Sequence, residues 1–121
     1  MALTVLNNLK HRSELQLDFY IQQEWENLVE FIKSQTDKIS IEPVTGNYDM
    51  MFYGNFYGLL SNAFKIPSDY WYITMRVNGL KSPMDYNGFT NIKIINPEFL
   101  STIYESIKQK IEKIKMLNVT I

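Results

Sequence analysis

The stretch DYWYITMRVNGLKSP, residues 69–83, decides between two folds for the centre of this chain. An aromatic trio opens it, an apolar run follows, and Asn78-Gly79 closes that run. The run can be a helix, because Asn and Gly readily adopt the left-handed conformation that ends helices. It can also be a strand, since aromatic and β-branched residues favour strands and Asn-Gly makes hairpin turns. We favour the helix, capped at its start by Ser68.

Two short strands are predicted on either side of this segment. Ile39 and Ile41 alternate with polar residues before a proline and a turn cluster, and NIKIINP, residues 91–97, alternates in the same way. Such period-two alternation beside turn residues is typical of strands. Between the first strand and the aromatic trio, residues 48–64 carry apolar side chains at helical spacing, despite two glycines that each cost a helix about 1 kcal/mol. Residues 38–97 are therefore predicted to form a strand, two helices and a strand.

An amphipathic helix is predicted ahead of this module. Ser13 and Gln16 have capping-box spacing, and an apolar series follows in steps of three or four residues. The series comprises Leu17, Ile21, Trp25, Leu28 and Ile32. We predict a helix from Ser13 to Ser34, although its first residues also alternate with the period of a strand. Residues 1–37 are thus expected to be an N-terminal helical arm.

A second amphipathic helix is predicted after the module, over residues 98–121. Asn96 is a suitable cap, Pro97 suits the first helical turn, and Glu98 complements the helix dipole. Apolar side chains then recur in alternating steps of four and three, the heptad rhythm of packed helices, at Leu100, Tyr104, Ile107, Ile111 and Ile114. This stripe can bind a partner, and each fully buried side chain would contribute about 1.5–3 kcal/mol. It can equally pack on the N-terminal helix of the same chain.

Length and composition predict a single domain of α+β class. A chain of 121 residues, 45% of them apolar, can bury one modest core. Its formal net charge of −1 offers no positive field for nucleic acid. The chain has no cysteine, no apolar run of about 18 residues and no signal-peptide pattern at its start. We therefore expect a protein made in the cytoplasm, with no disulfide, membrane span or nucleic-acid partner.

No group of residues has the spacing of a catalytic, cofactor or metal site. His11 is the only histidine and has no potential metal ligand at the right spacing, so we assign it to the surface. A carboxylate pair such as Asp49 with Asp69 could flank a glycosidic bond, but 13 acidic residues supply such pairs by chance. The segment YGNFYG lacks the lysine of a phosphate-binding loop. We predict a non-enzymatic protein without cofactor or metal.

Residues 48–57 are rich in aromatic and methionine side chains. A helix here would bury one side of this cluster, and Tyr and Met on the other side suit a surface that a partner covers. The candidate partner-binding residues are Tyr48, Met51, Tyr53 and Tyr57. Arg76 is the charged residue within YWYITMRV, and we predict that it makes a salt bridge or an interface contact.

The predicted order of elements resembles a LysM-type domain, whose second helix ends in a stop such as Asn-Gly before a polar turn and a last strand. The matching positions here are Trp71, Asn78, Gly79, Pro83, Gly88 and Ile94 to Pro97. A closer resemblance is to the LysM-like segment of baseplate wedge proteins from contractile-tailed phages. It lies in a phrase that this chain carries as Asn62-Ala63, Pro67, Tyr70-Trp71, Asn78 and Pro83. The chain departs from the general LysM pattern in its longer, aromatic first helix and its two flanking helices.

This resemblance implies a structural virion component in a phage tail baseplate wedge, with other baseplate or tail proteins as partners. Trp71 would point into the core of the module, with Tyr70 and Tyr72 toward the surface. Two alternatives stay open, besides a small enzyme that uses a carboxylate pair such as Asp49 with Asp69. One is a LysM module that binds a peptidoglycan-type glycan, since exposed Trp and Tyr present apolar faces with polar edges. The other is a small phage protein that binds a host protein.

Overall fold

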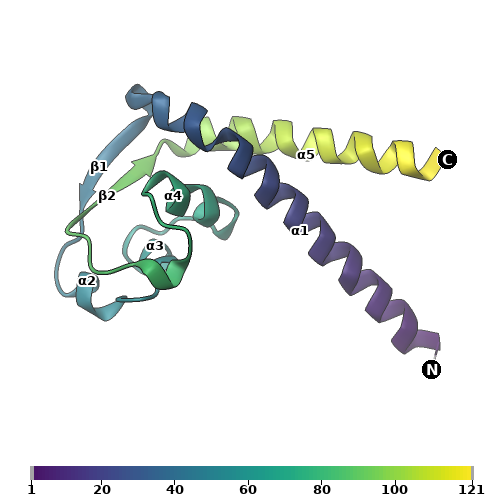
Figure 1. The fold of residues 1–121 in the computed structure, drawn as a ribbon, viewed down its shortest axis with the longest axis horizontal. Coiled ribbons are helices and arrows are strands. Elements are labelled where there is room, and N and C mark those ends of the chain that lie inside the picture. Colours follow the sequence, from purple (N-terminus) through teal and green to yellow (C-terminus); the bar gives the residue numbers. More distant parts are fainter. Residues whose placement is uncertain (1, 121) are drawn as a thin grey trace.

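Two long helices extend from a small head (Figure 1). The computed structural model describes the backbone of residues 2–120 and the side chains of residues 17–114. The long helices are α1 (Ala2–Ser34) and α5 (Pro97–Thr120). The head contains η1 (Thr36–Lys38), β1 (Ile39–Pro43), α2 (Tyr48–Met51), α3 (Phe56–Ala63), η2 (Ser68–Tyr70), α4 (Trp71–Val77), η3 (Pro83–Asp85) and β2 (Asn91–Ile95), where η marks a short 3-10 helix. The fold is α+β, as predicted.

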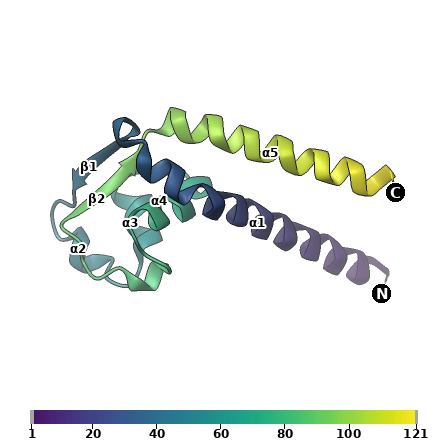
Figure 2. The same cartoon turned by 45° about the horizontal axis from the view of Figure 1, so that its top comes forward.

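The two strands pair antiparallel, and their pairing positions both long helices. Ile39 lies opposite Ile95. One residue further out, the Asn96 N–H donates to the Lys38 carbonyl at 2.8 Å. The chain therefore enters and leaves the head at the same edge. Consequently α1 and α5 project from one side of the head, and their far ends lie apart in both views (Figure 1, Figure 2).

The core divides into two clusters, and α4 lies between them. The first cluster joins the long helices to the head and contains Trp25, Val29, Ile32, Ile73, Val77, Ile95, Leu100, Ile107 and Ile111. The second lies within the head and contains Phe56, Leu59, Leu60, Met75, Leu80, Tyr86 and Ile92. Residues two apart on a helix point to opposite sides, so Ile73 belongs to one cluster and Met75 to the other. This makes α4 the central helix of the molecule.

The apolar run within residues 69–83 forms a helix and not a strand, as favoured above. α4 ends at Val77, and Gly79 follows with a φ of +84°. The Asn78 side chain accepts from the Lys93 N–H at 2.7 Å and donates to the Lys93 carbonyl at 2.9 Å, which ties the end of α4 to β2. The predicted cap was wrong, because Ser68 begins η2 and no side chain caps α4.

α1 begins at Ala2, well before the predicted start at Ser13. The segment before Ser13 has no Pro or Gly that would stop a helix, so the helix continues through the capping-box sequence. The alternative of a strand at the start of this segment was wrong. The side chains of His11, Ser13 and Gln16 lie outside the described side chains.

The single helix predicted over residues 48–64 is two helices. Gly54 separates α2 from α3 with a φ of +75°, a conformation that only glycine adopts readily. Asn55 then caps α3, and its side-chain oxygen accepts from the Gly58 N–H at 3.0 Å. The glycine that was treated as a weak point within a helix is therefore its boundary.

The start of α5 matches the sequence prediction. The Asn96 side-chain oxygen accepts from the Glu98 N–H at 2.8 Å, and Pro97 is the first helical residue. Because this cap lies beside the end of the sheet, it fixes the direction in which α5 leaves the head.

Candidate protein-binding surfaces

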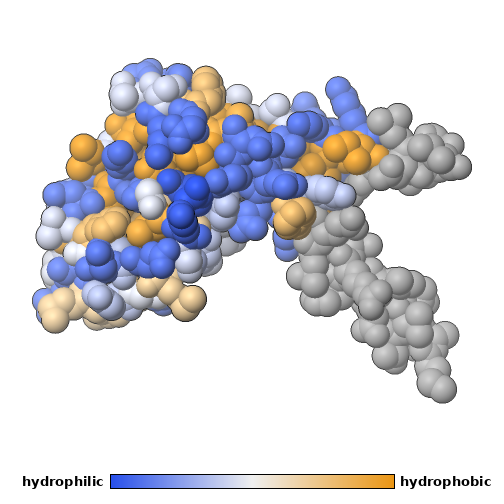
Figure 3. All heavy atoms as spheres, viewed as in Figure 1, coloured by the Kyte–Doolittle hydropathy of each residue, from blue (hydrophilic) through white to orange (hydrophobic). Residues whose placement is uncertain are grey.

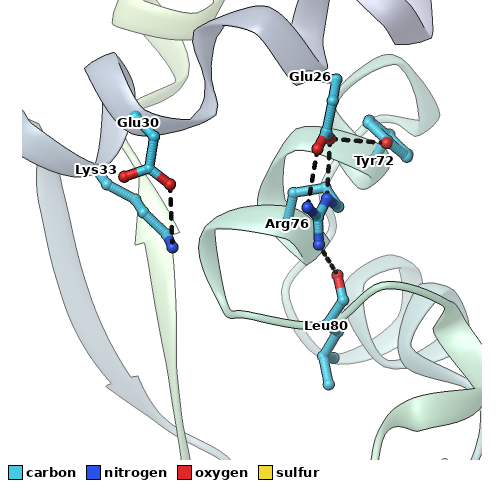
Figure 4. A network of polar contacts seen from close by, with 6 residues as sticks. All are labelled: Glu26, Glu30, Lys33, Tyr72, Arg76 and Leu80. Atoms are coloured by element: carbon cyan, nitrogen blue, oxygen red, sulfur yellow. Dashed lines mark hydrogen bonds and ion pairs between the residues drawn. The ribbon is translucent and has the colours of Figure 1, made fainter.

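Arg76 makes the predicted salt bridge, and it does so within the chain (Figure 4). Its Nε and Nη2 atoms donate to the two carboxylate oxygens of Glu26 at 2.8 Å each, and its Nη1 donates to the Leu80 carbonyl at 3.0 Å. The Tyr72 hydroxyl donates to the same carboxylate at 2.8 Å. The bond from Arg76 is the main reason why the pKa of Glu26 falls to about 2. This network joins α1 to α4, so Arg76 has a structural role.

The heptad stripe of α5 is mostly covered by this chain. Leu100, Ile107 and Ile111 are buried in the first cluster. Tyr104 is half-buried, and its ring is parallel to that of Trp25 with centroids 6.1 Å apart. Ile114, at 43%, is the most exposed residue of the stripe. The stripe thus packs on the other elements of its own chain, and the three buried side chains offer no surface to a partner in this fold.

The aromatic trio differs from the expected arrangement of one inward and two outward rings. All three side chains are half-buried, because consecutive residues of a helix point in three directions and α4 has neighbours on several sides. Trp71 packs at the edge of the second cluster against Tyr57, with ring centroids 5.4 Å apart, and its indole N–H donates to the Ile66 carbonyl at 2.7 Å. Tyr57, a predicted contact residue, is therefore largely occupied within the head, and burial raises its pKa.

Four further side chains of the 48–57 cluster are exposed together with Met84, whereas Phe52 and Phe56 pack in the second core cluster. We call the exposed set the methionine-tyrosine patch. It consists of Tyr48, Met50, Met51, Tyr53 and, from a separate loop, Met84. Met50 and Met84 are 76% and 78% exposed, and Met51 and Tyr53 are 67% and 68% exposed. The predicted contact residues Tyr48, Met51 and Tyr53 thus lie at the surface. In Figure 3, pale orange atoms lie in two places along the lower edge of the head, one where α2 lies in Figure 1 and one toward the opposite end of that edge, with white and blue atoms between them.

Backbone contacts join the two loops that carry the patch. The Gly54 N–H donates to the Tyr86 carbonyl at 2.8 Å, which brings the end of α2 beside η3. A Cβ added at Gly88 would lie 3.6 Å from the Asp49 carbonyl oxygen, so the return loop also runs close to α2. Tyr86, buried between the loops, anchors this arrangement. These contacts hold the two loops of the patch beside each other.

A second surface feature lies where α1, η2 and α5 meet, and we call it the aromatic cleft. Its volume is about 440 Å³. Its walls are formed by Asp18, Phe19, Ile21, Gln22, Trp25, Ser68, Asp69, Tyr72 and Tyr104. Four of these side chains are aromatic and two are carboxylates, and none is basic. Burial raises the pKa of Tyr104, and the carboxylate of Asp69 raises it further.

The carboxylate pair considered from the sequence does not form a site of its own. Asp49 accepts a bond from the neighbouring Met50 N–H at 2.9 Å in α2, whereas Asp69 accepts from the Tyr104 hydroxyl at 3.3 Å. Among the described residues, no group of three or more His, Asp or Glu side chains is placed to hold a metal ion.

Comparison of this chain with protein-family models, with curated proteins and with solved structures gave no match. Within the described part of the chain, no helix combines the length and the apolar character needed to cross a membrane.

Sequence reasoning missed Met84 and the whole aromatic cleft. Met84 stands alone among turn residues, and only the long-range contact between Gly54 and Tyr86 brings it to the patch. One wall of the cleft did have a signal. Asp18, Gln22 and Trp25 follow steps of four and three, and therefore share one face of α1.

Proposed function

We propose that this chain is a non-enzymatic assembly protein that binds another protein through the methionine-tyrosine patch. The observation that carries the proposal is the exposure of Met50, Met51, Tyr53 and Met84, each about two-thirds or more exposed, on two loops that backbone contacts join. Met adapts its shape to a partner, and Tyr is enriched at interfaces. The three methionines and Tyr53 lie outside both core clusters, whereas Tyr48 stacks on Phe52 at the edge of the second cluster. A surface that gathers exposed apolar side chains is a candidate interaction site.

We further propose that the assembly is a phage tail baseplate wedge, with other baseplate or tail proteins as partners and the virion as the final location. The support for this finer proposal is the sequence resemblance between Asn62 and Pro83. The binding of a host protein by the same patch would use the same chemistry and differ only in the partner.

The test compares purified variants in binding to candidate partner proteins. The double variant Met50→Ser with Met84→Ser removes one side chain from each loop of the patch, and Ile41→Ser is a matched control because Ile41 is 70% exposed on β1, outside the patch. Truncation of two central contacts is expected to weaken binding by about tenfold or more, while the control leaves it unchanged. Binding would be measured by calorimetry with a purified baseplate or tail protein.

Equal affinity of the patch variant and the wild type for every such protein would contradict the proposal. A titration with peptidoglycan fragments separates the glycan alternative. If those fragments changed Trp fluorescence and no protein bound, the assembly function would be wrong.

A further inference from the structure

The aromatic cleft combines two kinds of wall that together are selective for a positive charge. Phe19 lines it from α1 and is 55% exposed, and Tyr104 lines it from α5, whereas Trp25 is 1% exposed and stacks on Tyr104. Aromatic faces attract cations, with a gain of about 0.5–2 kcal/mol for each contact. Tyr104 already shows this behaviour, because the Lys108 ammonium lies 4.7 Å from the centre of its ring. That ammonium is held by Glu105 at 2.9 Å, outside the cleft lining.

The two carboxylates stand on separate elements, Asp18 on α1 and Asp69 in η2. Asp69 accepts one bond, from the Tyr104 hydroxyl. Among the described residues Asp18 has neither a hydrogen-bond nor an ion-pair partner. The cleft volume of about 440 Å³ is within the range of roughly 300–1,000 Å³ typical of ligand sites. An occupant that enters it meets negative charge from α1 and from η2.

Trp25 places an unpaired hydrogen-bond donor at the lining of the cleft. The side chain lines the cleft and is only 1% exposed, yet its indole Nε1 has no hydrogen-bond partner in the described structure. A buried donor without an acceptor costs about 1–3 kcal/mol. A free cation could not relieve this cost, because the indole N–H needs an acceptor. A residue within a polypeptide brings both a side-chain cation and a backbone carbonyl.

We propose that the aromatic cleft binds an arginine side chain of a partner polypeptide. Arginine fits better than lysine, because its planar guanidinium stacks on aromatic rings and forms paired hydrogen bonds with carboxylates. The inference rests on the proposed function, since the partner protein supplies the arginine. It uses residues outside the methionine-tyrosine patch, so the two proposals can fail separately.

The test uses the full chain and three blocked pentapeptides of sequence Gly-Ala-X-Ala-Gly, where X is arginine, lysine or citrulline. Citrulline keeps the shape of arginine without its charge. Binding is followed through the indole N–H signals in ¹⁵N NMR spectra, with Trp71→Phe identifying the signal of Trp25. The arginine peptide is expected to shift the Trp25 signal and to bind about fivefold or more tightly than the citrulline peptide.

Variants that remove negative charges test whether the arginine peptide binds in the aromatic cleft. Asp18→Asn with Asp69→Asn should weaken binding of the arginine peptide by about tenfold, because both carboxylates lose their charge. Asp37→Asn with Glu42→Gln removes the same number of charges outside the cleft, and should leave affinity unchanged. Equal binding of arginine and citrulline peptides, tighter binding of the lysine peptide, an unmoved Trp25 signal, or full binding by the cleft variant would each overturn the proposal. None of these results depends on the patch.

Discussion

The heptad stripe of α5 and the methionine-tyrosine patch were both candidate partner surfaces in the sequence. The fold buries most of the stripe and leaves the patch exposed. Ile107 and Ile111 are 3% and 5% exposed, whereas Met50 and Met84 are 76% and 78% exposed. The difference depends on which elements of the chain pack against each surface. The sheet directs α5 away from the head beside α1, which covers the stripe, while α3 packs against α2 and η3 and leaves Met50 and Met84 exposed. An apolar pattern therefore predicts that a surface is buried. The topology decides whether the same chain or a partner chain buries it.

The largest expected effect on stability comes from a charged substitution in the buried part of the α5 stripe. Ile107→Asp would place a charge without a partner in the first cluster, and should lower the free energy of unfolding by more than about 4 kcal/mol. Ile114→Asp, on the same stripe but 43% exposed, should lower it by less than about 1 kcal/mol. Urea unfolding followed by circular dichroism measures both. Similar losses of unfolding free energy in the two variants would contradict the account, in which Ile107 is buried in the core and Ile114 is partly exposed.

A smaller effect is expected from the network that joins α1 to α4. Arg76→Ala removes two hydrogen bonds to the partly exposed Glu26 and one to the Leu80 carbonyl, and should cost about 1–2 kcal/mol of unfolding free energy. Lys110→Ala is a control, because it removes the more exposed ion pair with Glu24 and should cost less than about 1 kcal/mol. Thermal or urea unfolding distinguishes the two. Equal costs would mean that the Arg76 geometry adds nothing to the stability of α1 on the head.

The same network predicts a pH dependence. The pKa of Glu26 is lowered from 4.5 to about 2, so its stabilising effect is complete above pH 4.5 and is lost as the pH falls toward 2. Because both side chains are partly exposed, the loss should be about 1–2 kcal/mol. Glu26→Gln should flatten that part of the curve of unfolding free energy against pH. An unchanged slope in this variant would assign the acid sensitivity to other carboxylates.

The smallest effect on the free energy of unfolding is expected from substitutions in the exposed methionine-tyrosine patch. Met50→Ser with Met84→Ser should change the free energy of unfolding by less than about 0.5 kcal/mol for each substitution, since neither side chain contributes to the core. The partner affinity should fall in the same protein. If unfolding free energy fell by several kcal/mol, the patch would be part of the fold, and its exposure would no longer support a binding role.

Local chemistry made much of the fold predictable. The Asn96 cap, both strands and the Asn78-Gly79 stop depend on neighbouring residues, and the sequence pattern indicated each of them. The break at Gly54 was missed, because helical spacing continues through residues that a left-handed glycine interrupts. The resemblance to LysM-like baseplate segments, by contrast, stays a prediction.

The candidate surfaces were less predictable than the fold. Tyr48 and Tyr57 have the same residue type in the same cluster, yet one is exposed and the other packs on Trp71. Only tertiary contacts separate them. The aromatic cleft needs residues from α1, η2 and α5, and pairings between such distant segments leave no local pattern in the sequence.

The most direct test of the central claim is the mass and fold of one variant beside the wild type. Ile107→Asp with Ile111→Asp would be examined by light scattering and near-ultraviolet circular dichroism. If the stripe is the core of its own chain, the variant loses its cooperative tertiary fold whatever the mass of the wild type. A variant that stays fully folded, with a mass below that of an associating wild type, would show that the stripe binds a second chain.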